Sequence, residues 1–157
     1  MLKKLITIIF SLGVLMTVSG CQSSDDAVSG DEFVEQFIND FLSFKYDESS
    51  SETDSNKHLI EKLKGNFTED GYTSFISHNY GMLPIQAAIK FESDIKVNEV
   101  QLTELFHDET EIGYEVDVKL QLPSDVATVN LILSLCQENN QWKIYALQVS
   151  KVDELLQ

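Results

Sequence analysis

The strongest constraint on the fold is an alternation of apolar and polar residues that runs from position 112 to position 122. Successive side chains of a β-strand point to opposite faces of its sheet, so this pattern predicts a long antiparallel strand with one buried face. The apolar residues of the pattern are Ile112, Tyr114, Val116, Val118, Leu120 and Leu122. The acids Glu115 and Asp117 fall on the opposite face. We therefore expect the interior of the domain to be filled with aliphatic side chains.

Three more segments carry the same two-residue period, which predicts strands at 94–106, 126–138 and 142–152. In the first of them the period slips by one residue near Asn98-Glu99, which indicates a β-bulge. Between the last two, Asn139-Asn140 predicts a two-residue hairpin, because asparagine tolerates the positive φ that such turns require. The second half of the chain is therefore expected to form a meander of three or four long strands.

The preceding part of the chain has the 3.6-residue period of amphipathic helices. The motif Ser29-Gly30-Asp31-Glu32 has the form of a capping box, and the apolar residues behind it predict a helix over 31–46. The stretch 47–55 is polar and acidic and contains no apolar residue, so we expect a solvated loop there.

A second helix is expected over 56–64, with Gly65 as its C-terminal cap. Thr68 is expected to cap a third, short helix. Residues 84–91 remain open between a short strand and a helical turn. Helices followed by antiparallel strands define an α+β domain, in which N-terminal helices pack on one face of the sheet.

Composition excludes several classes of partner. The 157 residues include 11 lysines, no arginine and 26 acids, which gives a formal charge of −15. Without the first twenty residues, nine lysines remain against 26 acids, and the charge is −17. Such a charge excludes a basic face for nucleic acid and favours a cationic partner. A hydrophobic content of 43% excludes a disordered chain.

The N-terminus has the features of a signal peptide. Two lysines at positions 3 and 4 precede an apolar run from 5 to 18, which is too short to cross a bilayer. The run ends in Val18-Ser19-Gly20-Cys21, which resembles the lipobox of bacterial lipoproteins. That resemblance implies that residues 1–20 are removed and that the Cys21 thiol carries diacylglycerol, with acyl chains such as palmitate.

The resemblance places the protein outside the cytoplasm, anchored to the cell membrane by the lipid on Cys21. Residues 21–30 are then the lipidated cysteine and a flexible tether, and 31–157 form a single domain. The abundance of Lys, Ile and Asn without Arg favours a Gram-positive cell. The alternative is an ordinary signal peptide or fixed membrane anchor, with Cys21 incidental. A further alternative is a role for the cleaved leader, in which a peptide from residues 12–20 serves as a mating signal between cells.

The C-terminal strands add a second resemblance. A long strand, the polar hairpin that follows Cys136, and then Trp142-Lys143-Ile144 are similar to the end of nuclear-transport-factor-like, or cystatin-like, domains. The resemblance covers about residues 31–152 and implies a cone, in which a curved antiparallel sheet wraps a long N-terminal helix. Similar small domains occur in conjugative-transfer and secretion machines of Gram-positive bacteria.

Enzymes of that fold work inside the cone with a carboxylate or imidazole base. Candidate cavity residues here are Tyr72, His78, Tyr80 and Asp94, but none matches a catalytic motif of the family. The three histidines have no closely spaced His or Cys partner, so we expect neither a metal nor a cofactor. With Cys21 acylated, Cys136 is the remaining thiol, and it is expected to be a buried apolar residue.

Two functions follow from these observations. The first is a non-catalytic protein- or peptide-binding module, or scaffold, of a cell-envelope assembly such as a conjugative-transfer or secretion machine. The second is a small-molecule carrier or an enzyme that uses the cone cavity. A polar-lined pocket of about 300 Å³ or more between the 31–46 helix and the sheet would distinguish them. The identity of the envelope partner and the oligomeric state stay open.

Overall fold

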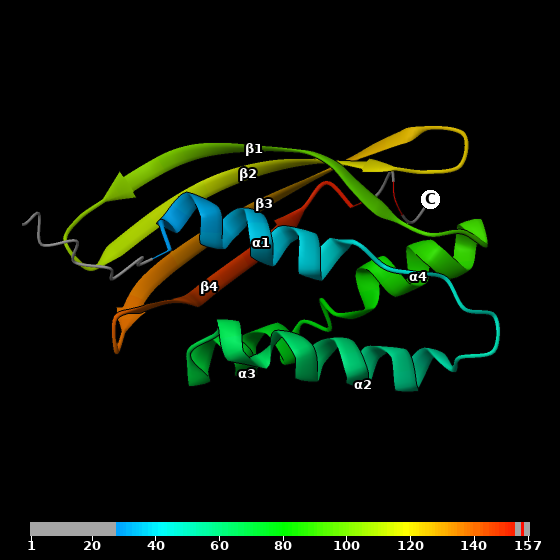
Figure 1. The fold of residues 1–157 in the computed structure, drawn as a ribbon, viewed down its shortest axis with the longest axis horizontal. Coiled ribbons are helices and arrows are strands. Elements are labelled where there is room, and N and C mark those ends of the chain that lie inside the picture. The colour runs from blue at the N-terminus through cyan, green and yellow to red at the C-terminus, as the bar shows by residue number, and fades with distance from the viewer. Residues whose placement is uncertain (1–27, 153–154, 156–157) are drawn as a thin grey trace, which may run out of the picture.

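The computed structural model describes residues 28–152 and Leu155. In these residues four α-helices and one 3₁₀ turn precede a four-stranded sheet (Figure 1). The helical elements are α1 (Gly30–Leu42), α2 (Glu52–Leu63), η1 (Lys64–Asn66), α3 (Glu69–Ser77) and α4 (Met82–Phe91). The strands are β1 (Lys96–His107), β2 (Glu111–Gln121), β3 (Val126–Glu138) and β4 (Gln141–Ser150). The predicted α+β class is confirmed.

The sheet is an antiparallel meander with strand order β1-β2-β3-β4. β2 and β3 pair without a register shift from Glu111 opposite Cys136 to Gln121 opposite Val126. The expected bulge in β1 is present, because its register against β2 shifts between Val97 and Glu99. Asn139 and Asn140 have φ values of 53° and 61°, so the predicted hairpin turn is confirmed as well.

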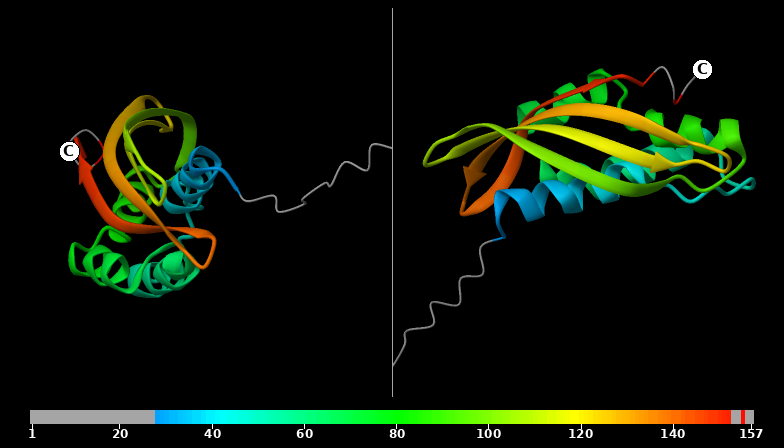
Figure 2. Two further views of the ribbon diagram at one scale, coloured as in Figure 1. Left: turned by 90° about the vertical axis from the view of Figure 1, so that its left-hand side faces the viewer. Right: turned by 90° about the horizontal axis from the view of Figure 1, so that it is seen from above.

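α1 lies in the concave face of the sheet, and the sheet seen end-on curves around it (Figure 2). Its apolar face is fully covered, with Val34, Phe37, Ile38, Phe41 and Leu42 at most 1% exposed. Each such side chain contributes about 1.5–3 kcal/mol when it leaves water. The expected arrangement of N-terminal helices on a curved antiparallel sheet is thus confirmed.

α1 begins where the capping motif places it but ends earlier than predicted. The Ser29 hydroxyl accepts a 3.2 Å hydrogen bond from the Glu32 amide. The helix stops at Leu42 instead of 46, because Ser43 is extended and Phe44 pairs with Ile95 through two backbone hydrogen bonds of 2.8 and 2.9 Å. The backbone bridge between Phe44 and Ile95 therefore ends the helix, although the local sequence pattern predicts helix up to residue 46.

α2 starts four residues before its predicted position, inside the expected loop. The Ser51 hydroxyl accepts a 3.1 Å hydrogen bond from the Asp54 amide and caps the helix. The prediction for Gly65 was wrong, because the chain passes from α2 directly into η1 and no described glycine has positive φ. Thr68 caps α3 as predicted, through a 3.0 Å bond from the Gly71 amide.

The undecided segment 84–91 is helical and forms most of α4. Pro84 lies in the first turn of α4. Backbone N–H groups have no helical acceptor there, so a proline, which lacks the N–H, costs no hydrogen bond. α4 ends at Glu92, which takes the left-handed conformation with φ 47°. Together with α2 and α3, it covers the side of α1 that faces away from the sheet (Figure 1).

Aromatic rings join α1 to the other helices. Phe37 and Phe41 stack at 5.6 Å, Phe67 meets Phe37 edge-on at 5.5 Å, and Phe75 packs on Phe67 at 4.9 Å. The sheet supplies the aliphatic half of the core. Its fully buried members are Val116, Val118, Leu120, Val129, Leu131, Leu133, Leu135 and Ile144. The interior is therefore filled with apolar side chains, with aromatic residues on the helical side.

Candidate functional site

One end of the domain gathers three segments that are far apart in the sequence. The start of α1, the β1–β2 turn and the β3–β4 turn lie together at the left of Figure 1. We call this region the α1 end. The first described residue, Val28, lies here, so the preceding part of the chain reaches the domain at this end.

A buried tyrosine fixes the start of α1 to the sheet. The Tyr114 hydroxyl, on β2, donates a 2.6 Å hydrogen bond to Oδ1 of Asp31. Tyr114 is only 3% exposed, and burial, followed by the hydrogen bond to Asp31, raises the pKa of its phenol. A Cβ at Gly30 would lie 2.8 Å from the tyrosine oxygen, so a larger residue at this first position of α1 would require the Tyr114 side chain to shift.

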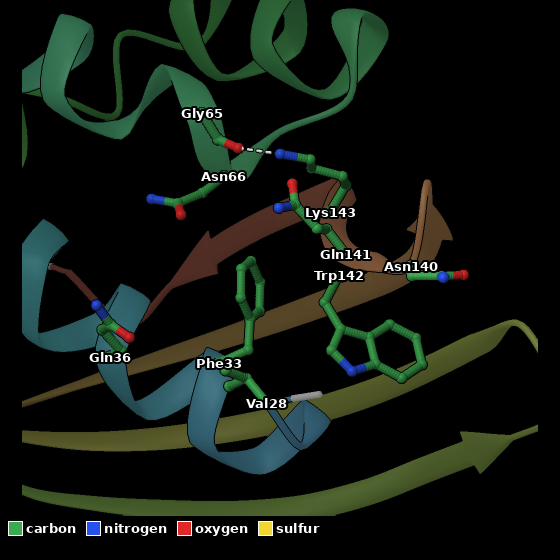
Figure 3. Close-up of a pocket in the computed structure, with 9 residues that line it drawn as sticks. All are labelled: Val28, Phe33, Gln36, Gly65, Asn66, Asn140, Gln141, Trp142 and Lys143. Atoms are coloured by element: carbon green, nitrogen blue, oxygen red, sulfur yellow. Dashed lines mark hydrogen bonds between the residues drawn. The ribbon is translucent and has the colours of Figure 1, made fainter. Parts of the chain in front are cut away.

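A pocket opens at the α1 end between α1, η1 and the β3–β4 hairpin (Figure 3). Its volume is about 390 Å³. The residues that line it are Val28, Phe33, Gln36, Gly65, Asn66, Asn140, Gln141, Trp142 and Lys143. The Lys143 ammonium donates a hydrogen bond to the Gly65 carbonyl and so connects β4 to η1 across the pocket.

The second feature of the α1 end is the β1–β2 tip, which we define as residues 104–111. Leu105 is 50% exposed and Phe106 is 42% exposed, at a register shift of β1. The ring of Phe106 lies over Gly113, where a Cβ would overlap it. The tip also contains four acids, namely Glu104, Asp108, Glu109 and Glu111.

The tip contains several hydrogen bonds of its own. The Asp108 carboxylate accepts from the amides of Thr110 and Glu111 at 3.0 and 2.9 Å, and these bonds lower the pKa of Asp108. Nδ1 of His107 lies 3.2 Å from Glu104. The tip therefore presents an acidic, partly apolar surface of defined shape.

The four residues proposed from the sequence as cavity residues lie in three places. His78 and Tyr80 stack on each other, with ring centroids 5.2 Å apart, at the end of α3. Tyr72 is half-buried on α3 beneath the Lys64 ammonium, which lies 5.5 Å from its ring. Asp94 is exposed and accepts a 3.0 Å hydrogen bond from the Tyr46 amide, beside an open hollow of about 540 Å³.

The outer face of the sheet carries a polar network. Asn130 on β3 is 6% exposed and donates hydrogen bonds to Glu115 at 3.1 Å and Asp117 at 3.0 Å. The side-chain oxygen Oδ1 of Asn130 accepts a hydrogen bond from the Ser150 hydroxyl at 3.0 Å. Cys136 lies half-buried on the same strand, and burial, followed by the charges of Glu138 and Glu111, raises the pKa of its thiol.

Sequence reasoning missed the pocket, although it had singled out one of its residues. The C-terminal resemblance includes Trp142, which is half-buried against the core in the structure and also lines the pocket. Asn140, Gln141 and Lys143 are its neighbours in the hairpin, but the rest of the lining, from Val28 to Asn66, is 76 or more positions away. The site can be recognised only in the folded structure, where these segments lie together.

The remaining observations concern membranes and metals. Among the residues that the structure describes, no helix is long and apolar enough to span a bilayer. Within the same residues, no three His, Cys, Asp or Glu side chains are grouped to hold a metal ion. Cys21 lies outside the described residues, as do residues 1–20.

Comparison with known proteins gives a likeness of fold. No protein-family model matches the sequence, and no curated protein matches it. Ten chains of solved structures match. One is an IcmL-like type IV secretion system protein from Legionella pneumophila, with a TM-score of 0.53 and 13% sequence identity. The match covers 75% of this chain and 87% of that one, so the two proteins are similar in fold over most of their length.

Proposed function

We propose that this protein is a lipid-anchored, non-catalytic docking module of a cell-envelope secretion or transfer assembly. Three observations support the proposal. The lipobox-like motif ending at Cys21 favours an anchor, the fold is similar to that of a type IV secretion system protein, and the domain interior is filled. The third observation carries the most weight.

The filled interior favours binding at the surface over chemistry inside the cone. An enzyme of this shape needs a cavity between the long helix and the sheet, with an acid or base that faces into it. Here the five inward side chains of α1 are at most 1% exposed and belong to one buried apolar cluster with residues of the sheet. A carboxylate or imidazole has no space in that contact.

The alternative of a carrier or enzyme has less support. The pocket at the α1 end exceeds 300 Å³, but Tyr72, His78 and Asp94 do not line it in the described residues. Its one titratable side chain among those residues is Lys143, which is held by the Gly65 carbonyl. We therefore treat the pocket as a binding site and not as a catalytic one.

The β1–β2 tip is the docking surface that we propose. Leu105 and Phe106 are both exposed and offer apolar contact area, while the four acids of the tip favour a cationic partner. Charge complementarity of this kind accelerates association and selects between partners. The partner is thus expected to be a protein with an apolar socket bordered by lysine or arginine.

The proposed anchor places this surface near the membrane. Eight residue steps separate Cys21 from Ser29, so covalent geometry limits their separation to about 28 Å. The β1–β2 tip is at the same end of the domain as the start of α1 (Figure 1), which Ser29 caps. A lipid on Cys21 would therefore direct the tip toward partners that lie at the membrane surface.

Crosslinking in native cells tests the proposed surface. The double variant Leu105→Ser, Phe106→Ser removes the apolar part of the tip, and Ile89→Ser on α4 is the control, because Ile89 is also exposed (45%) but lies on another face. The wild type and the control are expected to recover the same membrane-associated protein of a transfer or secretion assembly, and the tip variant is expected to lose it. Recovery of that protein by all three, or of no envelope protein by the wild type, would contradict the proposal.

A further inference from the structure

The pocket at the α1 end has an unusual lining for so acidic a protein. The chain carries 26 acids, yet none is among the described residues that line the pocket. Four of those residues carry side-chain amides, namely Gln36, Asn66, Asn140 and Gln141. The set also contains two aromatic rings, from Phe33 and Trp142, together with Val28, Gly65 and Lys143.

The charges of the lining favour a neutral ligand over an ionic one. A divalent cation would need carboxylates, and the described lining has none. A phosphate is best held by several cationic donors, whereas the described lining has one ammonium, that of Lys143, which also donates to the Gly65 carbonyl. The acids Asp31 and Glu32 at the start of α1 also oppose an anion there. The pocket therefore fits a neutral ligand.

The arrangement of the side chains restricts the ligand further. Phe33, Val28 and Trp142 lie together on one side of the pocket, and Gln36, Asn66 and Gln141 lie around them (Figure 3). A primary amide both donates and accepts hydrogen bonds, so it can pair with hydroxyl and acetamido groups in either direction. An aromatic face, in turn, packs on the C–H surface of a sugar ring.

The part of β4 that lines the pocket does not favour binding of an extended peptide. An extended peptide is usually bound through unpaired backbone groups of a strand edge. The strand residues of this pocket, Gln141, Trp142 and Lys143, pair with β3 on one side. On the other side, the carbonyl of the next residue, Ile144, accepts a 3.1 Å bond from the Thr68 amide, which places the helical segment against that edge.

From these features we propose that the pocket at the α1 end binds a neutral saccharide, with N-acetylated pyranose units as the best fit. The acetamido group supplies a donor, an acceptor and a methyl group, which match the amides and the apolar side of the pocket. A volume of about 390 Å³ lies within the range of small-ligand sites. This inference is independent of the docking surface proposed above, because it uses none of the residues 104–111.

The protein contains a signal that reports on this pocket directly. Trp142 is the only tryptophan of the chain, so intrinsic fluorescence arises from the pocket lining. Titration of the purified protein with chitotetraose, a neutral N-acetylglucosamine tetramer, is expected to shift the emission to shorter wavelength and to saturate. The side-chain amide signals of Gln36 and Asn66 are expected to shift with the same midpoint in ¹H–¹⁵N NMR spectra.

Two exposed glutamines provide the matched variants. Gln36→Ala removes one amide of the pocket, whereas Gln86→Ala removes an exposed amide from α4. Gln36→Ala is expected to weaken chitotetraose binding roughly three- to tenfold, as the loss of one hydrogen bond predicts, and Gln86→Ala is expected to leave it unchanged. Both substitutions are on helix surfaces, so both variants are expected to fold.

Other outcomes would overturn the inference. Absence of any Trp142 emission or amide shift at millimolar chitotetraose would exclude the saccharide. Equal binding by the wild type and Gln36→Ala would place the saccharide elsewhere on the protein. Saturation by inorganic phosphate, or by an extended peptide such as hexa-alanine, while chitotetraose has no effect, would assign the pocket to a different class of ligand.

Discussion

The hydroxyl of Tyr114 lies 2.6 Å from the carboxylate of Asp31 and joins the middle strand β2 to the first turn of α1. Hydrogen bonds to charged groups stabilise folded proteins by about 1.5–3 kcal/mol. Tyr114→Phe keeps the ring and removes this bond. We expect the free energy of unfolding to fall by about 1–3 kcal/mol, as measured by urea denaturation.

A second tyrosine serves as the control for that substitution. The Tyr145 hydroxyl, on β4, makes a longer hydrogen bond of 3.3 Å to Glu111, and its side chain is half-buried. Tyr145→Phe is therefore expected to cost less than Tyr114→Phe. Equal losses for the two variants would mean that the Tyr114–Asp31 bond has no special role in holding α1.

The same tyrosine predicts a loss of stability at alkaline pH. Burial and the Asp31 carboxylate raise the pKa of Tyr114, so the folded protein retains the phenol proton after the unfolded chain has released it. The resulting contribution to stability is complete below the ordinary tyrosine pKa of about 10 and decreases as the pH rises above it. Urea midpoints measured from pH 8 to 11 are expected to decline more steeply for the wild type than for Tyr114→Phe. Parallel curves would contradict this coupling.

Two glycines differ sharply in the space around them. A Cβ at Gly71, the buried glycine of α3, would overlap the backbone carbonyl of Ile144, whereas nothing lies within 4 Å of a Cβ at Gly65. Gly71→Ala must therefore push α3 away from β4, at a cost of about 1–3 kcal/mol or more. Gly65→Ala is expected to change the free energy of unfolding by less than about 0.5 kcal/mol or to increase it slightly. Thermal denaturation of both variants checks this contrast.

Cys136 is expected to be a poor nucleophile. Burial, together with the negative charges of Glu138 and Glu111, raises the pKa of its thiol, so little thiolate is present at neutral pH. In a Cys21→Ala background the reaction with iodoacetamide at pH 7.5 is expected to be slower than for the same protein unfolded in urea. A native rate equal to the unfolded rate would show that the β-sheet environment does not protect this residue.

The sequence predicted the sheet more completely than the helices. The alternation around Val116 and Val118 and the paired asparagines at 139 and 140 are local signals, and each was confirmed. The ends of α1 and α2 are not set by the apolar period of the sequence. A backbone bridge between Phe44 and Ile95, 51 positions apart, ends the first helix, and no periodicity in one segment can show it.

The candidate sites were less predictable for the same reason. Tyr72, His78, Tyr80 and Asp94 were chosen for their chemistry, and the fold separates them into three places. The pocket at the α1 end combines side chains of ordinary types from three distant segments. Trp142 carried the one sequence signal for it, as the only tryptophan of the chain, but a tryptophan in a strand more often packs on the core.

The lipid on Cys21 is the central claim, because the location of the protein, its orientation and the nature of its partners all depend on it. Intact-mass spectrometry of the native protein, extracted from the membrane fraction with detergent, tests it most directly. The account predicts a chain of residues 21–157 that carries diacylglycerol on its N-terminal cysteine, and it predicts no such species for Cys21→Ala. A protein that retains Met1, or one with an unmodified N-terminus at or after residue 21, would contradict the account.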